Sequence, residues 1–109
     1  MYYNRKGEEV KDVMEWANLL ETPDYCIVKQ ETIHGYFIST VWFGIDYNFL
    51  SVGKPIIFET MVFSTTGSSC AEMYRYSTEE EARTGHEAIA DKYRKMNIIT
   101  RYWRAIRGK

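Results

Sequence analysis

The sequence has few cysteines, few prolines and almost no net charge. Of its 109 residues, two are cysteine and two are proline, and the formal net charge is −1. Cys26 and Cys70 do not form a C-x-x-C pair, and two thiols without histidine partners cannot hold a structural zinc ion. We therefore expect two free, buried thiols in a reducing compartment rather than a disulfide. A nearly neutral chain also has no overall attraction to nucleic acid or to an anionic membrane.

Long apolar runs are also missing. No run reaches the ~20 residues that a membrane-spanning helix needs. The first residues, MYYNRKGEEV, lack the apolar segment of a secretion signal. These features predict a cytoplasmic protein. With 45% apolar and 27% charged residues, the chain is typical of one soluble domain over residues 1–109, with a core over about 2–96 and a C-terminal extension over 97–109.

Aromatic residues, in contrast, are plentiful. They make up 16% of the chain, and nine of them are tyrosine. A small core uses large side chains to bury enough area. Tyrosine is also common on surfaces that bind a protein partner. Both explanations stay open at the level of the sequence.

Hydrophobic periodicity predicts an α+β domain. Helical spacing over residues 13–21 follows Asp12 as N-cap, and a second helix over 79–97 follows Ser77 or Thr78 as cap. Between them, β-branched and alternating segments predict strands over 25–33, 36–45, 56–64 and 71–76, with a tight His34-Gly35 turn after the first. The third strand is apolar on both faces, so we expect it to be central. The order α-β-β-β-β-α indicates a four-stranded antiparallel sheet flanked by the two helices.

The two ends of the chain are less regular. Residues 2–10 predict a short strand or a turn, with Asn4–Gly7 as the turn. The second helix turns its apolar residues to one side, and Gly85 beside them predicts a close approach to the sheet. That apolar side consists of Ala82, His86, Ile89, Tyr93 and Met96. Residues 98–106 fit either a helical turn or an added strand.

Glu59 is an acid with apolar neighbours inside the third predicted strand. A carboxylate in that position is costly unless it has a partner, a solvated groove or a ligand. We expect its partner to be Arg75 on the next strand or His86 on the overlying helix, and these three residues are candidates for a ligand pocket. A salt bridge on the sheet surface, or a hydrogen bond to Thr40, is the structural alternative.

Catalytic motifs are missing from the sequence. His86-Glu87 resembles the start of an H-E-x-x-H zinc motif, but Ala90 stands where the second histidine is needed. A Glu59–His86 pair would be an acid–base couple. Neither a G-x-S-x-G nucleophile turn nor a glycine-rich phosphate loop occurs. We therefore predict a non-enzymatic protein with no metal and no cofactor.

Two further segments are candidates for partner binding. The loop after the second strand holds Asp46, Tyr47, Asn48 and Phe49, and loops on a rigid sheet often carry recognition residues, although Asp46 and Asn48 are also good turn formers. The C-terminal segment mixes basic and aromatic residues, which is typical of nucleic-acid binding and equally of a solvated helix end. Its candidates are Lys95, Arg101, Tyr102, Trp103, Arg104 and Arg107.

Three sequence blocks together resemble a family of small, uncharacterised bacteriophage and prophage proteins. The blocks are STVWFGIDYNF (39–49), PIIFETMVF (55–63) and RYSTEEEARTGHEA (75–88). The resemblance covers roughly residues 2–90, and Tyr47 stands where the family has histidine. It implies a phage origin and action in the host cell, and it carries no particular chemistry.

The leading hypothesis is a non-enzymatic phage accessory protein that binds and inhibits a host protein, for example an anti-CRISPR-like inhibitor of a defence complex. One alternative is a binder of a small nucleotide signal that uses Glu59, Arg75 and His86. Another is a nucleic-acid binder that uses the basic C-terminal segment. An exposed edge strand rich in tyrosine is also compatible with a homodimer.

Overall fold

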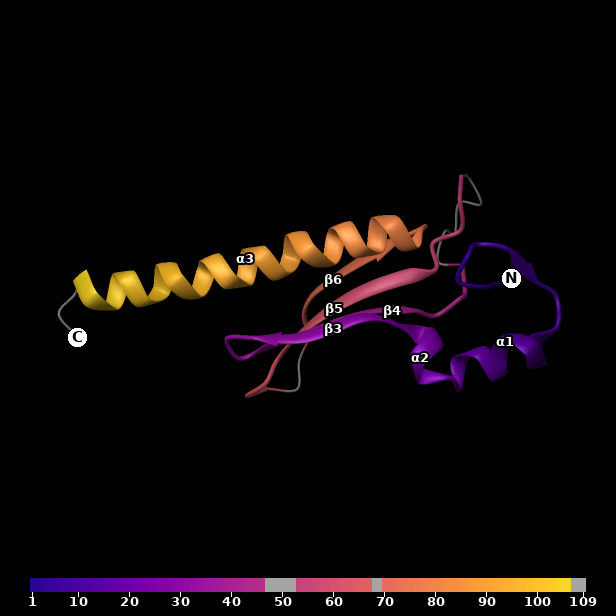
Figure 1. Cartoon of the computed structure of the whole chain (residues 1–109), viewed down its shortest axis with the longest axis horizontal. Coiled ribbons are helices and arrows are strands. Elements are labelled where there is room, and N and C mark those ends of the chain that lie inside the picture. Colours follow the sequence, from indigo (N-terminus) through magenta and orange to yellow (C-terminus); the bar gives the residue numbers. More distant parts are fainter. Residues whose placement is uncertain (47–52, 68–69, 107–109) are drawn as a thin grey trace.

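The computed structural model describes residues 1–46, 53–67 and 70–106, with side chains of the last helix described as far as Met96. A four-stranded antiparallel sheet carries one long helix, α3, across one face (Figure 1). The strands lie side by side in chain order and are β3 (Ile27–Ile33), β4 (Tyr36–Trp42), β5 (Phe58–Ser64) and β6 (Cys70–Tyr76). The α+β class, the antiparallel sheet and the central position of the third predicted strand are confirmed.

The N-terminal residues form a small unit at one end of the sheet. β1 (Tyr2–Tyr3) pairs with β2 (Glu9–Val10), and α1 (Val13–Leu20) follows. The carboxylate of Asp12 accepts a hydrogen bond from the Met14 N–H at 2.9 Å, which confirms the expected N-cap. The predicted first strand begins too early, because Pro23 starts a short helix, α2 (Pro23–Cys26), before β3. Proline suits this first helical position because its φ angle is already helical.

The turn between β3 and β4 is the predicted His34-Gly35 pair. The φ angles of these residues are 48° and 87°, as a two-residue hairpin with the twist of the strands requires. The Gly35 carbonyl also accepts a hydrogen bond from the Thr65 N–H at 2.8 Å. This bond ties the hairpin to the turn that follows β5.

α3 (Glu79–Ile106) is longer than the sheet that it covers. Its 28 residues span about 42 Å, whereas a seven-residue strand spans about 23 Å. The C-terminal part of α3 therefore extends past the strands (Figure 1), and the molecule measures 61 × 28 × 21 Å. The helix does not stop near Asn97 as expected, and the alternative of an added strand over 98–106 is wrong.

The start of α3 is fixed by a reciprocal cap. The Thr78 hydroxyl accepts from the Glu81 N–H, and the Glu81 carboxylate accepts from the Thr78 N–H, both at 3.1 Å.

Within the described residues, no helix is both long enough and apolar enough to cross a membrane.

The core lies between α3 and the face of the sheet that α3 covers. Alternate residues of the two central strands point into it and are at most 1% exposed: Ile38, Thr40, Trp42, Phe58, Thr60 and Val62. From α3 they meet Ala82, His86, Ile89, Ala90 and Tyr93, whereas Met96 is 44% exposed and does not belong to the core. Among the described tyrosines only Tyr74 is exposed, so most of them serve packing.

Gly85 allows α3 to approach the sheet closely, as its position in the sequence predicts. A Cβ atom at this position would lie 2.4 Å from the ring of Tyr76 on β6. Only glycine therefore fits at this contact without a shift of the helix or of the ring.

Candidate functional site

The three residues expected to form a ligand pocket lie on opposite faces of the sheet. Glu59 and Arg75 are direct cross-strand partners on the face that α3 does not cover. His86 is fully buried on the covered face. Successive side chains of a strand alternate between faces, and Phe58 and Thr60 on either side of Glu59 point toward α3. The prediction of a pocket formed by Glu59, Arg75 and His86 together is therefore wrong, whereas the expected position of Arg75 beside Glu59 on the next strand is confirmed.

His86 is part of a hydrogen-bonded chain that crosses the core. Its Nε2 lies 2.6 Å from an oxygen of Glu31 on β3, and its Nδ1 lies 2.7 Å from the Thr40 hydroxyl. Thr40 is in turn 2.5 Å from the hydroxyl of Thr60. Thr40, considered above as a partner for Glu59, thus bonds to His86 instead.

The donor and the acceptor in each of these hydrogen bonds follow from the Glu31 carboxylate at one end. The Glu31 carboxylate only accepts, so His86 donates from Nε2. With a neutral ring, Nδ1 accepts from Thr40, and the Thr40 oxygen accepts from Thr60. Each buried polar group on this path is satisfied. His86, Thr40 and Thr60 are all 0% exposed, so these three groups are closed off from solvent, and their hydrogen bonds hold α3 on the sheet.

Glu31 is the member of this hydrogen-bonded network that reaches the surface. Partial burial opposes ionisation of Glu31, but the hydrogen bond from His86 and the positive charges nearby outweigh it and lower the pKa of Glu31. The charges belong to Lys29, 3.6 Å from one carboxylate oxygen, and Arg94, 3.2 Å from the other.

Glu31, His86 and Glu87 also have the donor types of a metal site. Their ligand atoms lie within 4.8 Å of one another. The ammonium of Lys29, however, bonds to Glu87 and lies beside Glu31, so a cation of the protein already neutralises both carboxylates. A metal ion would have to displace Lys29 and take the Nε2 position that now bonds to Glu31. The cluster fits an internal ion-pair network better than a metal centre.

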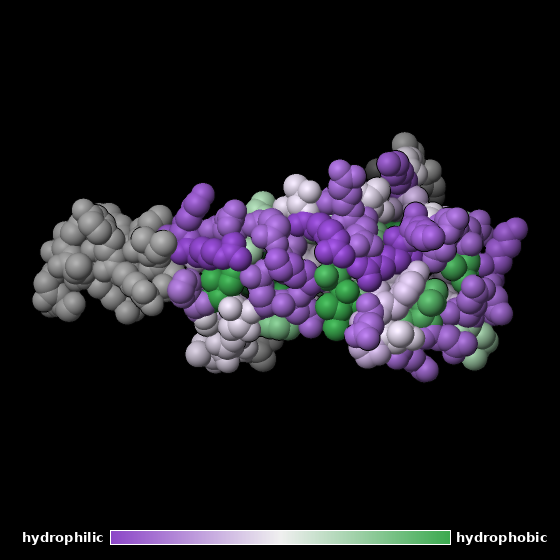
Figure 2. All heavy atoms as spheres, viewed as in Figure 1, coloured by the Kyte–Doolittle hydropathy of each residue, from purple (hydrophilic) through white to green (hydrophobic). Residues whose placement is uncertain are grey.

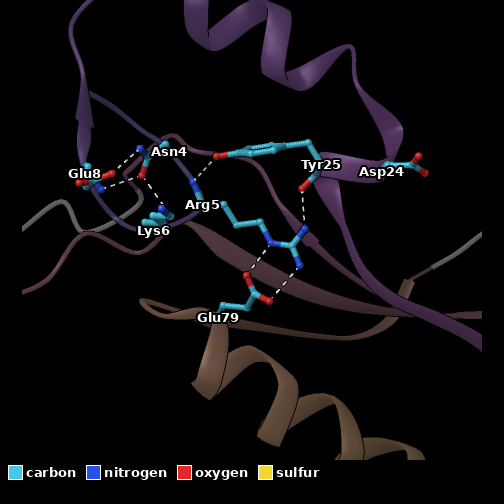
Figure 3. Close-up of a pocket in the computed structure, with 7 residues that line it drawn as sticks. All are labelled: Asn4, Arg5, Lys6, Glu8, Asp24, Tyr25 and Glu79. Carbon is cyan, nitrogen blue, oxygen red and sulfur yellow. Dashed lines mark hydrogen bonds and ion pairs between the residues drawn. The ribbon is translucent and has the colours of Figure 1, made fainter.

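A polar pocket of about 350 Å³ lies where the β1–β2 hairpin, α2 and α3 meet (Figure 3). The guanidinium of Arg5 is part of its lining and donates from Nε and Nη2 to the two oxygens of Glu79 at 2.6 and 3.0 Å. A third nitrogen, Nη1, donates to the Tyr25 carbonyl at 2.9 Å. The hydrogen bonds from Arg5 outweigh partial burial and lower the pKa of Glu79. Arg5 is therefore engaged in joining three elements rather than available to a ligand.

The face of the sheet opposite α3, which we call the outer face, is apolar at its centre. Its apolar members are Phe37, Val41, Met61, Phe63 and Met73, and its polar members are Gln30, Thr32, Ser39, Glu59 and Arg75. All are half-buried or exposed. α3 lies on the other face, and α1 and α2 gather at the end of the sheet where β3 begins (Figure 1), so no described helix covers the outer face. On the side of the molecule in Figure 2 the surface is mostly hydrophilic, with small separate apolar patches.

The structure describes only some of the candidate partner-binding residues in the loop after β4 and in the C-terminal segment. The Asp46 carboxylate accepts from the Ile56 N–H at 2.9 Å and closes the base of its loop, whereas Tyr47, Asn48 and Phe49 lie outside the described residues. Lys95 is exposed on α3. The backbone around Arg101, Tyr102, Trp103 and Arg104 is helical, but their side chains are outside the description, as is all of Arg107.

Further basic residues of α3 and the two cysteines are also described by the structure. Two basic residues of α3 are held in ion pairs, Lys92 with Glu72 and Arg94 with Asp91, both at 2.6 Å. Both thiols are free, but neither is fully buried as expected: Cys26 is half-buried and Cys70 is exposed.

Comparison of the chain with protein-family models, with curated proteins and with solved structures finds no match. Its function is therefore inferred from its own geometry and from the three sequence blocks described above.

Proposed function

We propose that the chain is a non-enzymatic phage accessory protein that binds and inhibits a host protein through its outer face. The observation that carries this proposal is the composition of the two faces of the sheet. The face under α3 includes Thr40 and Thr60, whereas the same strands place Phe37, Met61 and Phe63 on the face that no described helix covers. A group of large apolar side chains that no described helix covers is typical of an interaction site.

The arrangement of the outer face suits a protein better than a polyanion. Met61 lies opposite Met73 and Ser39, and Phe63 lies opposite Phe37, so the apolar residues are contiguous. Glu59 and Arg75 flank them with one negative and one positive charge. An apolar centre with a polar rim is the usual anatomy of a protein interface. A surface without excess positive charge lacks the main source of affinity for nucleic acid.

The ionisable groups of the core support a binding role rather than catalysis. His86 is closed off by Thr40 and Glu31, and Lys29 and Arg94 engage the acid at the end of that chain. The phage setting, and with it a host defence protein as the target, comes from the resemblance of the three sequence blocks to phage proteins.

A capture experiment with matched variants tests the proposal. Met61→Lys places a charge at the centre of the outer face, where the half-exposed side chain can still reach water. Met14→Lys makes the same change on α1, at a residue that is 64% exposed. From host lysate, the wild type and Met14→Lys should enrich the same protein and inhibit its activity, and Met61→Lys should do neither while keeping its circular dichroism spectrum. Equal enrichment by all three would refute the role of the outer face.

A further inference from the structure

β6 is an edge strand, and the direction of its backbone groups can be assigned. The Tyr76 carbonyl accepts from the Ile57 N–H at 3.0 Å, so Tyr76 directs its backbone groups toward β5. Because this direction alternates along an antiparallel strand, Tyr74 does the same and Met73 directs its N–H and C=O away from β5. Among the described strands none pairs with that side of β6. An edge of this kind is a template for one more strand.

The two edges of the sheet are protected to different degrees. β3 has a bulge between Ile27 and Lys29, and Lys29 reaches across to Glu87 on α3. Bulges and lysines are common devices that prevent edge pairing. β6 contains neither proline nor lysine, and its bulge lies near Cys70, so the pairing from Glu72 to Tyr76 is regular.

We propose that a second copy of this chain pairs with β6, antiparallel and across a two-fold axis at Met73, to form one continuous sheet. Directly opposite residues of an antiparallel pair lie on the same face. A two-fold axis at Glu72 would place two carboxylates opposite each other, and an axis at Arg75 would place two guanidinium groups opposite each other. Both arrangements are unfavourable, because like charges directly opposite on neighbouring strands repel. An axis at Met73 places Tyr74 opposite Glu72 of the second copy, twice.

The pairing of Tyr74 with Glu72 of the second copy resembles a hydrogen bond that the strand already makes within one chain. The Tyr74 hydroxyl donates to the Glu72 carboxylate of its own chain at 2.5 Å, and Lys92 donates to the same oxygen at 2.6 Å. With the second copy in place, each Glu72 lies between the tyrosines of both chains. An axis at Tyr74 would instead place Met73 opposite Arg75 and lose this match.

The space beside β6 can accept the added strand. An apolar groove of about 310 Å³ runs between β6 and α3, and it is lined by Tyr74, Tyr76, Gly85, Ala88, Ile89 and Lys92. A strand added to an edge sends alternate side chains toward such a groove, while main-chain hydrogen bonds supply affinity. On the opposite side of the sheet, the two Met73 side chains meet and join the two outer faces into one.

Molar mass in solution tests the pairing with the protein alone, so the result does not depend on the host partner of the proposed function. Light scattering over a dilution series into the millimolar range should show reversible association to twice the chain mass of 12.9 kDa, since a short edge contact buries less than the ~1,200 Å² of a standard interface and dissociates on dilution. Met73→Pro removes the outward N–H but no bond to β5, and should be monomeric with an unchanged circular dichroism spectrum. Met73→Thr keeps the N–H and should still dimerise. A monomeric wild type, or a dimeric Met73→Pro, would overturn the proposal.

Cross-linking tests the position of the axis. In a Cys70→Ser background, Met73→Cys should form a disulfide-linked dimer on oxidation, because opposite Cα atoms in a sheet lie about 5.5 Å apart, within disulfide range. Arg75→Cys should not, because it would face Ala71. Efficient cross-linking through Arg75→Cys or Tyr74→Cys, but not Met73→Cys, would overturn the assigned axis.

Discussion

His86 on α3 and Glu31 on β3 are 55 residues apart in sequence and bond to each other at 2.6 Å. The bond ends a path that starts at the buried hydroxyls of the two central strands and reaches the surface beside Lys29 and Arg94. It fastens the long helix to the sheet through polar contacts rather than through apolar packing alone. The consequences for stability can be measured.

Replacing His86 should destabilise the fold strongly. His86→Ala leaves a cavity and removes the partner of Thr40, and an unsatisfied buried polar group typically costs about 1–3 kcal/mol in addition to the lost packing. We expect a loss of about 3–4 kcal/mol in the free energy of unfolding, measured by urea denaturation.

The matched control for His86→Ala is Glu31→Gln. It keeps an acceptor for Nε2 and should cost about 1 kcal/mol, because only the charge is removed. A loss below 1 kcal/mol for His86→Ala would contradict the structural role of this chain of hydrogen bonds.

Gly85→Ala should destabilise the protein, although alanine is the better helix former by about 1 kcal/mol. The added Cβ would lie 2.4 Å from the Tyr76 ring, so the ring or the helix must move. We expect a net loss of about 1–3 kcal/mol in the free energy of unfolding. In a Tyr76→Ala background the clash is gone, and the same substitution should become neutral or stabilising. The same loss in both backgrounds would show that the contact with Tyr76 does not decide the effect.

Acid should weaken the fold through Glu72. Partial burial disfavours its charged form, but hydrogen bonds from Lys92 and two tyrosine hydroxyls outweigh this and lower its pKa from 4.5 to about 2. A pKa that is lower in the folded state means that the stabilisation is complete above pH 4.5 and is lost as the pH falls toward 2. The free energy of unfolding should decline over this window.

Glu72→Gln is the matched variant for the pH experiment, because it removes the titrating group and keeps the shape. Its free energy of unfolding should decline less steeply between pH 4.5 and pH 2 than that of the wild type. Identical slopes would show that other carboxylates, among them Glu31 and Glu79, account for the acid sensitivity.

Divalent metal should not stabilise the protein. Lys29 already neutralises Glu31 and Glu87, so Zn²⁺ would compete with a tethered ammonium. Thermal melting with added Zn²⁺ and with a chelator should give the same midpoint. A midpoint that rises with zinc concentration would show that the metal displaces Lys29, since a ligand of the folded state raises the apparent stability.

The sequence predicted the strands because their local signals are strong. Alternating β-branched residues, the His34-Gly35 turn and the Thr78 cap each specify one local conformation. The face that α3 covers is hard to predict, because Phe58, Thr60 and Val62 alternate with Glu59, Met61 and Phe63, and both sets contain large apolar residues. Arg75 is the cross-strand neighbour of Glu59, as one of the two alternatives expected, whereas His86 lies on the opposite face of the sheet.

The missed contacts share one property, which is distance along the chain. Arg5 and Glu79 are 74 residues apart, and no local pattern links the N-terminal turn to the cap of α3. The sequence alone does not decide between the two alternatives for residues 98–106, a helical turn and an added strand, for a different reason. The apolar residues of this segment fit both a period of two and a period of 3.6, and backbone continuity with the helix decided between them.

The central claim is that the outer face binds the host partner. It is tested most directly by comparing the affinity of that partner for Met61→Lys with its affinity for Met14→Lys. Titration calorimetry with the purified partner should give wild-type affinity for Met14→Lys and at least a tenfold weaker affinity for Met61→Lys, equal to about 1.4 kcal/mol. Equal affinities for the two variants would contradict the claim that the outer face binds the partner.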